Sequence, residues 1–412
     1  MSRLKLSLSA ALTLLIALSV GTALAQEPVL ISAEGDFEGS AVIYDDEALS
    51  DAITFTMTNV PKLDVGLAYA GWLISDDEST TLKTGSMILD DGSISHIYDS
   101  LTLGYTGENL IRGYDRLIVT VESLESEILA PSGETVFSYK VPADVIEHVR
   151  HLVTDWPPGS GTGIFTNLIS QLEVALANAS VAADKSSIED VRHQMELAVN
   201  ALEGPDGDNY GDLDGDGTIE DVGDGVGVIA RVRQREQTGF VLNSSFDDTF
   251  IMAHLVGLEL DGLNIESLVD DAVAEALLAL DEFALDRAKV SAAGVAGFIE
   301  AALKGVDTDA SDVIDSVLGE GGAAQAYVEA QLMATYSLQV GPIPTPTPTP
   351  TPAPPTATPA PVIAVATPTP TPEAPSVGDP TVPAAAPMGL LLALVLLLGG
   401  GALLWRRSPS GQ

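Results

Sequence analysis

The sequence predicts an α+β protein of several parts: an N-terminal β-sandwich, an α-helical bundle, a Pro/Thr-rich stalk and one C-terminal transmembrane helix. Three observations lead to this prediction. Residues 26–141 alternate apolar and polar side chains between turn residues, whereas residues 142–340 shift to a helical period. Each end of the chain also contains an apolar stretch without charges. We therefore expect two globular units between a signal and an anchor.

Residues 1–25 are typical of a cleaved signal peptide. Arg3 and Lys5 precede an apolar stretch at 6–20, and Ala23-Leu24-Ala25 is a small-x-small cleavage site. An uncleaved anchor helix is the alternative. Cleavage would leave the mature chain outside the cytoplasm.

The C-terminal end predicts a membrane anchor. Residues 387–405 contain no charge and are long enough to cross a hydrocarbon core of ~30 Å. Arg406 and Arg407 follow at once, so we expect residues 406–412 to form a cytoplasmic tail. The prediction is a single-pass protein of the cell membrane with its N-terminal part outside.

Residues 341–386 form the predicted stalk. The segment alternates Pro with Thr and Ala, which favours an extended polyproline-II spacer over a packed core. Its threonines could carry O-linked sugars. The stalk would hold the globular part away from the membrane.

Charge and cysteine content exclude several function classes. The 412 residues contain no cysteine, and 18 basic residues face 59 acidic ones, for a formal net charge of −41. The absence of thiols excludes disulfides, cysteine nucleophiles and iron–sulfur clusters. So acidic a surface repels nucleic acid and attracts divalent cations. We expect cations, and no nucleic acid, among the partners.

The β-sandwich is expected within 26–141. Short alternating runs are separated by turn residues such as Asp90-Asp91-Gly92, with no helical period between them. The predicted strands are Val29–Ser32, Ala41–Tyr44, Ile53–Thr58, Ala68–Ile74, Lys83–Leu89, Ser93–Tyr98, Leu117–Glu122 and Thr135–Lys140.

Part of this region resembles the extracytoplasmic C-terminal domain of anti-sigma-K factors. The similarity lies in Tyr69-Ala70-Gly71-Trp72-Leu73, in the turns at Gly85 and Asp91-Gly92, and in the strand from Tyr114 to Glu122. It covers about a quarter of the chain. The resemblance implies a sandwich of the bacterial envelope with a sensing or scaffolding heritage. Direct sigma-factor binding is not expected, because a signal peptide stands where the family has its cytoplasmic segment.

The helical domain is expected at 142–340. Ile164, Leu168 and Leu172 begin one apolar face, and Ser186 with Glu189 predicts the capped start of a second helix. Asn264 is expected to cap a third. Further helices are predicted at about Phe246–Leu260, Arg287–Lys304 and Ala323–Leu338.

The sharpest local motif is an acidic loop within 206–224 that resembles an EF-hand or dockerin-type calcium loop. Counting Asp212 as position 1, Asp occupies positions 1, 3 and 5, Gly occupies position 6, and Gly223 stands at position 12 where a Glu belongs. The expected ligands of a structural calcium ion are Asp212, Asp214, Asp216, Thr218, Glu220 and Asp224. The sequence contains one copy of this motif, whereas a dockerin needs two, so cohesin binding is not expected. A solvated acidic turn without an ion is the alternative.

The histidines support a competing hypothesis. His148 and His151 are spaced i, i+3, and His193 precedes Glu196 by three on a predicted helix, which is how metal sites in helical bundles are built. A metal- or haem-dependent module using His148, His151 and His193 is therefore the alternative function.

The leading hypothesis is a non-enzymatic bacterial surface protein acting in adhesion, scaffolding or envelope sensing, with calcium as a structural ion. The sequence contains no G-x-S-x-G, H-E-x-x-H or Walker motif. It does not identify a protein or glycan partner.

Overall fold

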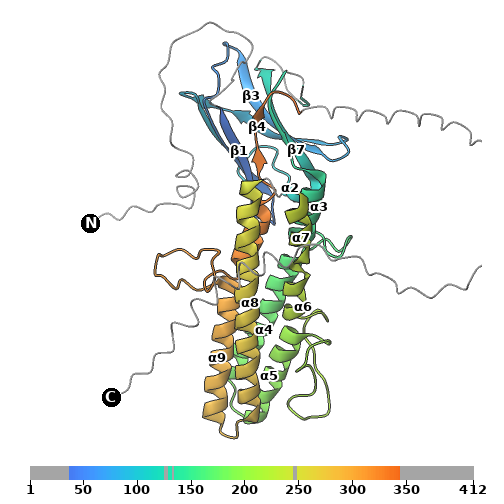
Figure 1. The fold of residues 1–412 in the computed structure, drawn as a ribbon, viewed down its shortest axis with the longest axis vertical. Helices are drawn as coiled ribbons and strands as arrows, with labels where there is room; N and C mark the ends of the chain where they lie inside the picture. Colours follow the sequence, from blue (N-terminus) through green and yellow to red (C-terminus); the bar gives the residue numbers. More distant parts are fainter. Residues whose placement is uncertain (1–36, 125–128, 132–133, 245–247, 344–412) are drawn as a thin grey trace, which may run out of the picture.

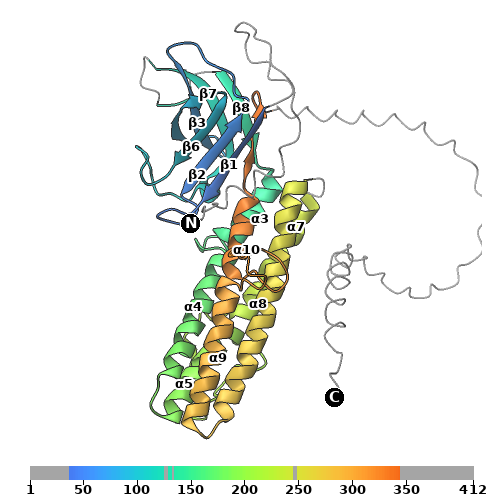
Figure 2. The same cartoon turned by 90° about the vertical axis from the view of Figure 1, so that its left-hand side faces the viewer.

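The computed structural model describes residues 37–124, 129–131, 134–244 and 248–343. It is an α+β protein in which two antiparallel β-sheets are followed by a helical region. Figures 1 and 2 show the helices projecting as a long bundle from one end of the sheets. The predicted signal peptide, most of the stalk, the membrane segment, the tail and the strand at 29–32 lie outside the described residues.

Each sheet has five strands. The first has the order β5 (Leu89–Asp90), β6 (Ser93–Tyr98), β2 (Ala52–Thr58), β1 (Glu38–Tyr44) and β9 (Tyr336–Ser337). The second has the order β10 (Gln339–Val340), β8 (Glu134–Lys140), β7 (Tyr114–Ser123), β3 (Leu67–Ser75) and β4 (Thr81–Met87). The seven strands predicted between residues 41 and 140 are confirmed, because each has one apolar face that the fold buries.

The two sheets share a core of large side chains. Phe55 of β2, Tyr69 of β3 and Phe137 of β8 are almost fully buried, and the Phe137 ring stacks on Phe37 at a centroid distance of 4.1 Å. Gly71 of β3 leaves room for the neighbouring core side chains. A Cβ at this position would lie 3.3 Å from Cζ of Phe55 and closer still to Thr84 and Met87. Gly71 in the predicted strand Ala68–Ile74 therefore serves close packing of side chains in the core.

The last two strands join the sheets from the far end of the sequence. Ala41 of β1 pairs with Tyr336 of β9, and Phe137 of β8 pairs with Val340 of β10. The Tyr336 hydroxyl, fully buried, donates to the Tyr114 carbonyl at 3.2 Å. The helix predicted to run to Leu338 is therefore wrong at its end: α10 (Ala323–Leu332) stops early, and the chain returns to the sheets.

The helical region is thus inserted between β8 and β9. Short helices α2 (Leu110–Gly113) and α3 (Ala143–Val153) lie beside the sheets. The long helices are α4 (Ile164–Ala183), α5 (Ile188–Glu203), α8 (Thr249–Asp281) and α9 (Leu285–Lys304). Between α5 and α8 the chain forms α6 (Val228–Arg233), the 3-10 turn η2 (Gln234–Glu236) and α7 (Gln237–Ser244).

Small side chains allow the long helices to pack closely. Ala175, Ala179, Ala272, Ala276 and Ala292 are fully buried on α4, α8 and α9. These helices contact one another along their length, with α8 against α9 and α4 against both α9 and α5. Replacing buried alanine by a larger side chain would overpack these seams at a cost of about 1–3 kcal/mol.

Two predicted helix starts are wrong. The cap of α5 is Ser187, not Ser186, and its hydroxyl accepts the Asp190 N–H at 3.1 Å. Asn264 caps nothing, because the two helices predicted at 246–260 and from 264 form the single helix α8. Within α8, Gly262 lets the Arg235 side chain lie against the helix, because a Cβ there would lie 2.6 Å from Arg235 Nε.

No helix in the described ranges is long and apolar enough to cross a membrane.

Candidate metal centre

The predicted calcium loop is a closed excursion between α5 and α6. Its two ends touch: a Cβ on Gly227 would lie 2.5 Å from the Gly204 nitrogen. Both glycines have a positive φ, 71° at Gly204 and 84° at Gly227, which other residues rarely adopt. We call residues 204–227 the first acidic loop. Because Gly204 and Gly227 are in contact, the chain enters α6 beside the end of α5.

Two side chains of α5 hold the first acidic loop. Glu196, fully buried, accepts the Leu213 N–H at 2.8 Å and the Asp214 N–H at 3.0 Å on Oε2. Its Oε1 accepts the Glu220 N–H at 3.0 Å. Asn200, one helical turn later, donates to the Gly211 and Glu220 carbonyls at 3.0 and 2.7 Å. Both halves of the loop are therefore fixed to one helix face.

The aspartates of the motif shape the turn itself. Asp212 accepts the N–H groups of Gly215 and Gly217 at 2.8 and 2.9 Å. Asp214 accepts the Asp216 N–H at 2.9 Å, and Asp216 accepts the Thr218 N–H at 2.8 Å. Carboxylate oxygens of Glu196, Asp212 and Asp214 all lie within 4.8 Å of one another. Oxygens so close suit a hard divalent cation.

The structure does not bring all predicted ligands together. Asp224 lies outside the cluster, because Arg231 of α6 forms an ion pair with it and donates from Nε at 2.7 Å. Asp216 lies on the turn but belongs to none of the ligand groups formed by the described His, Asp and Glu side chains. The predicted ligand Thr218 follows on the same turn, and its N–H donates to Asp216. Of the predicted carboxylates, Asp212 and Asp214 form one ligand group with Glu196, and Glu220 belongs to another.

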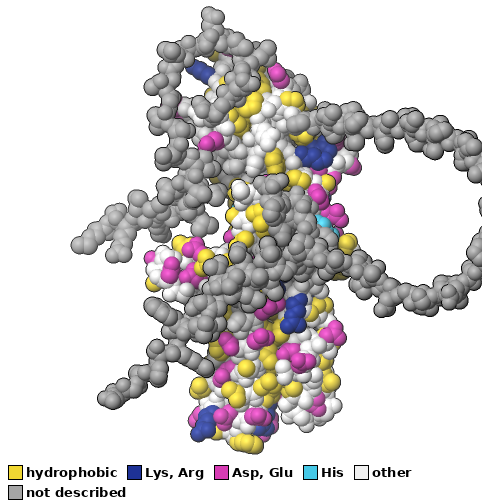
Figure 3. Space-filling model, viewed as in Figure 1, with side chains coloured by type: hydrophobic (Ala, Val, Ile, Leu, Met, Phe, Trp, Pro, Cys, Tyr) yellow, Lys and Arg dark blue, Asp and Glu magenta, His cyan; other side chains and the backbone are white. Residues whose placement is uncertain are grey.

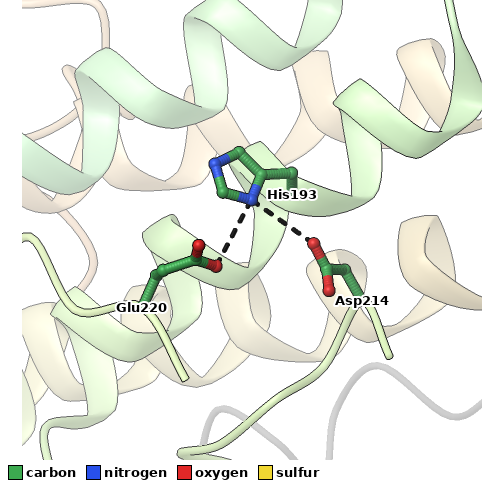
Figure 4. A group of neighbouring side chains, drawn as sticks. All are labelled: His193, Asp214 and Glu220. Carbon is green, nitrogen blue, oxygen red and sulfur yellow. Dashed lines mark ion pairs between the residues drawn. The ribbon is translucent and has the colours of Figure 1, made fainter. Parts of the chain in front are cut away.

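A second group of side chains meets at the same place. His193 Nδ1 lies 3.3 Å from an Asp214 oxygen and 3.4 Å from Glu220 Oε2. Figure 4 shows the imidazole of α5 facing both carboxylates of the loop. The sequence signal for this contact was the His193-x-x-Glu196 spacing, which places both side chains on one face of α5.

Burial and like charges act on the Glu220 carboxyl. Its pKa is raised, first because the group is partly removed from water and further because Asp216, Glu196 and Asp214 are close; His193 opposes the shift. A bound cation would relieve this repulsion.

A second acidic loop at 305–322, which the sequence motif does not predict, repeats the arrangement. Counting Asp307 as position 1, Asp307 accepts the N–H of position 6 at 2.9 Å, and Asp309 accepts that of position 5 at 2.9 Å. Asp212 and Asp214 accept from the same positions in the first loop. Positions 4 and 6 have positive φ in both loops: 79° and 94° at Gly215 and Gly217, and 60° and 67° at Ala310 and Asp312.

A buried glutamate completes each loop. Glu320 accepts the Thr308 N–H and hydroxyl on Oε1 and the Asp315 N–H on Oε2, at 3.2, 2.8 and 3.3 Å. These hydrogen bonds, that of the Thr308 hydroxyl foremost, lower the pKa of the Glu320 carboxyl. Oxygens of Asp307, Asp309 and Glu320 lie within 4.8 Å of one another, as do those of the first loop.

The second acidic loop is also held by a helix and closed by glycines. Asn264 of α8 donates to the Val317 and Gly321 carbonyls at 2.8 and 3.1 Å and accepts the Gly319 N–H at 2.7 Å. A Cβ on Gly322 would lie 2.6 Å from the Gly305 nitrogen. In Figure 1 the two loops lie on opposite sides of the helical region.

The other histidines lie elsewhere. His148 and His151 of α3 both contact Gln237 Oε1, at 2.9 and 3.0 Å. His254 of α8 pairs with Glu329 at 2.6 Å. Neither arrangement includes His193, and no ligand group among the described residues joins His148 and His151 to it.

The charge distribution agrees with cation binding. On the face in Figure 3, acidic side chains are spread over the helical region and few basic ones accompany them. Comparison with known proteins adds no family: no family model, curated protein or solved structure matches the chain.

Proposed function

We propose that this chain is a non-enzymatic protein of the bacterial cell surface whose helical region is stiffened by structural calcium bound in its acidic loops. The observation behind the proposal is the buried carboxylate of Glu196. It fixes the backbone of the loop on three N–H groups, and its oxygens lie beside those of Asp212 and Asp214. Calcium selects such oxygen ligands.

The second acidic loop supports the same function. Its ligand group of Asp307, Asp309 and Glu320 has the same composition as Asp212, Asp214 and Glu196. Two ions, one on each side of the helical region, would offset part of the large negative charge and restrain two long excursions. Such stiffening suits an element that presents a surface to a partner, as in adhesion or scaffolding.

The proposed topology gives the helical region an orientation. The described chain begins and ends at the sheets, whereas the helices project from them. A β-sandwich tethered through the stalk at 341–386 and the membrane segment at 387–405 would direct the helices outward. The sandwich and the anti-sigma-K resemblance also leave envelope sensing as a role for the β region.

Calcium titration of the full chain in detergent tests the metal. We expect a higher melting temperature in millimolar calcium than in chelator, because an ion at 100 times its Kd adds about 2.7 kcal/mol to the free energy of unfolding. Asp212→Asn should reduce the shift. Asp206→Asn, which removes the same charge from an exposed position of the loop, should not. Equal melting temperatures with and without calcium would refute the proposal.

Protease treatment of intact cells tests the topology. Added protease should remove the helical region from whole cells, and full protection of an unprocessed chain would contradict surface display.

A further inference from the structure

His193 faces two carboxylates without forming a hydrogen bond to either. Its Nδ1 is nearly equidistant from Asp214 and Glu220, at 3.3 and 3.4 Å. Among the described residues, the polar contacts of the His193 side chain are these two ion pairs, and neither meets hydrogen-bond geometry. A histidine that simply bridged two acids would be expected to direct its N–H at one of them.

The Glu220 oxygen in this group also lacks a partner. Oε2 is buried and accepts no hydrogen bond from the described residues. A buried carboxylate oxygen without a donor is costly, and native proteins rarely leave one unsatisfied. The side chain of His193 remains 38% exposed, so the group is open to solvent on one side.

The spacing fits a single ion. The three ligand atoms of His193, Asp214 and Glu220 lie within 4.8 Å of one another. A tetrahedral ion with bonds of about 2.0–2.2 Å separates its ligand atoms by ~3.3–3.6 Å. The two distances from His193 Nδ1 fall in that interval, as a shared ion requires.

The donor set distinguishes this group from a calcium loop. Imidazole nitrogen suits zinc and other first-row transition metals, whereas calcium selects oxygen. Three protein ligands of mixed nitrogen and oxygen, with one side open for water, are typical of zinc. We propose that His193, Asp214 and Glu220 bind a divalent transition-metal ion, zinc in the first place, next to the calcium-type group of the first acidic loop.

Glu196 positions this site. It lies one turn from His193 on α5 and binds the backbone N–H groups of both Asp214 and Glu220. The two carboxylate ligands are therefore fixed at their backbone beside His193 before a metal arrives. The site uses the loop that the proposed function fills with calcium and shares Asp214 with it, so the two metals must be tested separately.

The test is zinc binding to the metal-stripped full chain in millimolar calcium, measured by competition with a chromophoric chelator. His193→Gln removes only the nitrogen ligand. It should weaken zinc binding at least as much as the ~10–100-fold that loss of an outer-shell partner costs. His254→Gln is the matched control, because His254 also pairs with a carboxylate but belongs to no ligand group in the described chain. The His254→Gln variant should bind one zinc ion with the same affinity as the parent chain.

A second readout keeps the test independent of small losses in stability. Cobalt(II) bound to the parent chain should give the visible d–d absorption of a four-coordinate nitrogen and oxygen site, and His193→Gln should abolish it. Equal zinc affinity in parent and His193→Gln, or no zinc binding at all, would overturn the inference.

The calcium response separates the two proposals. Retention of the calcium-induced melting shift in His193→Gln, with zinc binding lost, supports the mixed site. Asp212→Asn that loses the calcium shift but keeps zinc binding also supports it. A parent chain that binds zinc but shows no calcium shift would refute the calcium proposal alone.

Discussion

Glu196 and Glu320 hold their respective loops through the same backbone positions. Each buried carboxylate accepts the N–H of position 2 on one oxygen and that of position 9 on the other. Glu196 comes from the helix before its loop, at position −15 if Asp212 is position 1, whereas Glu320 is position 14 of its own loop. The same arrangement is therefore reached from opposite directions along the chain.

Replacing Glu196 by Gln should loosen the first acidic loop. An amide has one oxygen in place of two and directs an NH₂ group at the N–H donors that the carboxylate accepted. We expect a loss of about 1–3 kcal/mol in the free energy of unfolding and a smaller calcium-induced melting shift. Glu189→Gln, an exposed substitution on the same helix, is the control for chemical denaturation. Similar effects of both changes would count against the role of Glu196.

Asn264→Ala should free the second acidic loop. The side chain makes three hydrogen bonds to the backbone at Val317, Gly319 and Gly321, and alanine leaves these groups without a partner from α8. We expect faster proteolytic cleavage within 305–322. Asn178→Ala, which removes a bond to the carbonyl one turn earlier on α4, should leave cleavage there unchanged. An unaltered cleavage rate in Asn264→Ala would contradict the prediction.

Asp261 should make stability fall as pH rises. Burial raises its pKa to about 8; the Ser316 hydroxyl, which donates at 2.8 Å, opposes the shift, and Glu329 adds to it. Because the folded protein binds this proton more tightly than the unfolded chain, the contribution is complete below pH about 4 and is lost as pH rises to about 8.

Asp261→Asn removes this titration. Between pH 5 and pH 8 the variant should gain more than about 1.4 kcal/mol relative to the parent chain, the value of one pKa unit. Urea denaturation at both pH values measures the difference. Parallel pH profiles of parent and variant would show that Asp261 is not protonated in the folded protein.

Tyr336 should contribute to the sheets more through its ring than through its hydroxyl. The ring is buried beside Tyr139 at a centroid distance of 6.4 Å, and the hydroxyl makes one hydrogen bond to Tyr114. Tyr336→Phe should cost about 1 kcal/mol and Tyr336→Ala about 3–5 kcal/mol in the free energy of unfolding. Thermal denaturation distinguishes these values, and equal losses would indicate that the hydrogen bond dominates.

Local patterns were enough to predict most strands and the first acidic loop. Strands such as Ile53–Thr58 bury one face, and that alternation is visible in the sequence. β9 and β10 have two residues each and depend on partners such as Ala41 that lie far away in the chain, so no short window predicts them. Helix α8 was divided in the prediction because its buried Asp261 and Gly262 are explained only by side chains from other segments.

The ligand groups in the structure also differ from the motif, because contacts with distant segments help to determine them. The second acidic loop has Asp312 instead of glycine at position 6, and Glu320 lies two residues beyond the usual last ligand. In the first loop, Asp224 forms an ion pair with Arg231 instead of joining the cluster. Glu196 and His193 of α5 contact the loop at Asp214. Motif spacing identifies ligands within a loop but not those supplied by a neighbouring helix.

The insertion of the helices between β8 and β9 determines when the sheets can be completed. Ala41 pairs with Tyr336, which lies 336 − 41 = 295 positions later in the chain. Until residues 336–340 have been synthesised, β1 and β8 are open sheet edges that could pair with another chain. Contacts of such high order form slowly. The helices run away from the sheets and back again, so a folded helical region places residues 336–340 close to β1 and β8. This proximity should speed the pairing of β9 and β10 with these strands.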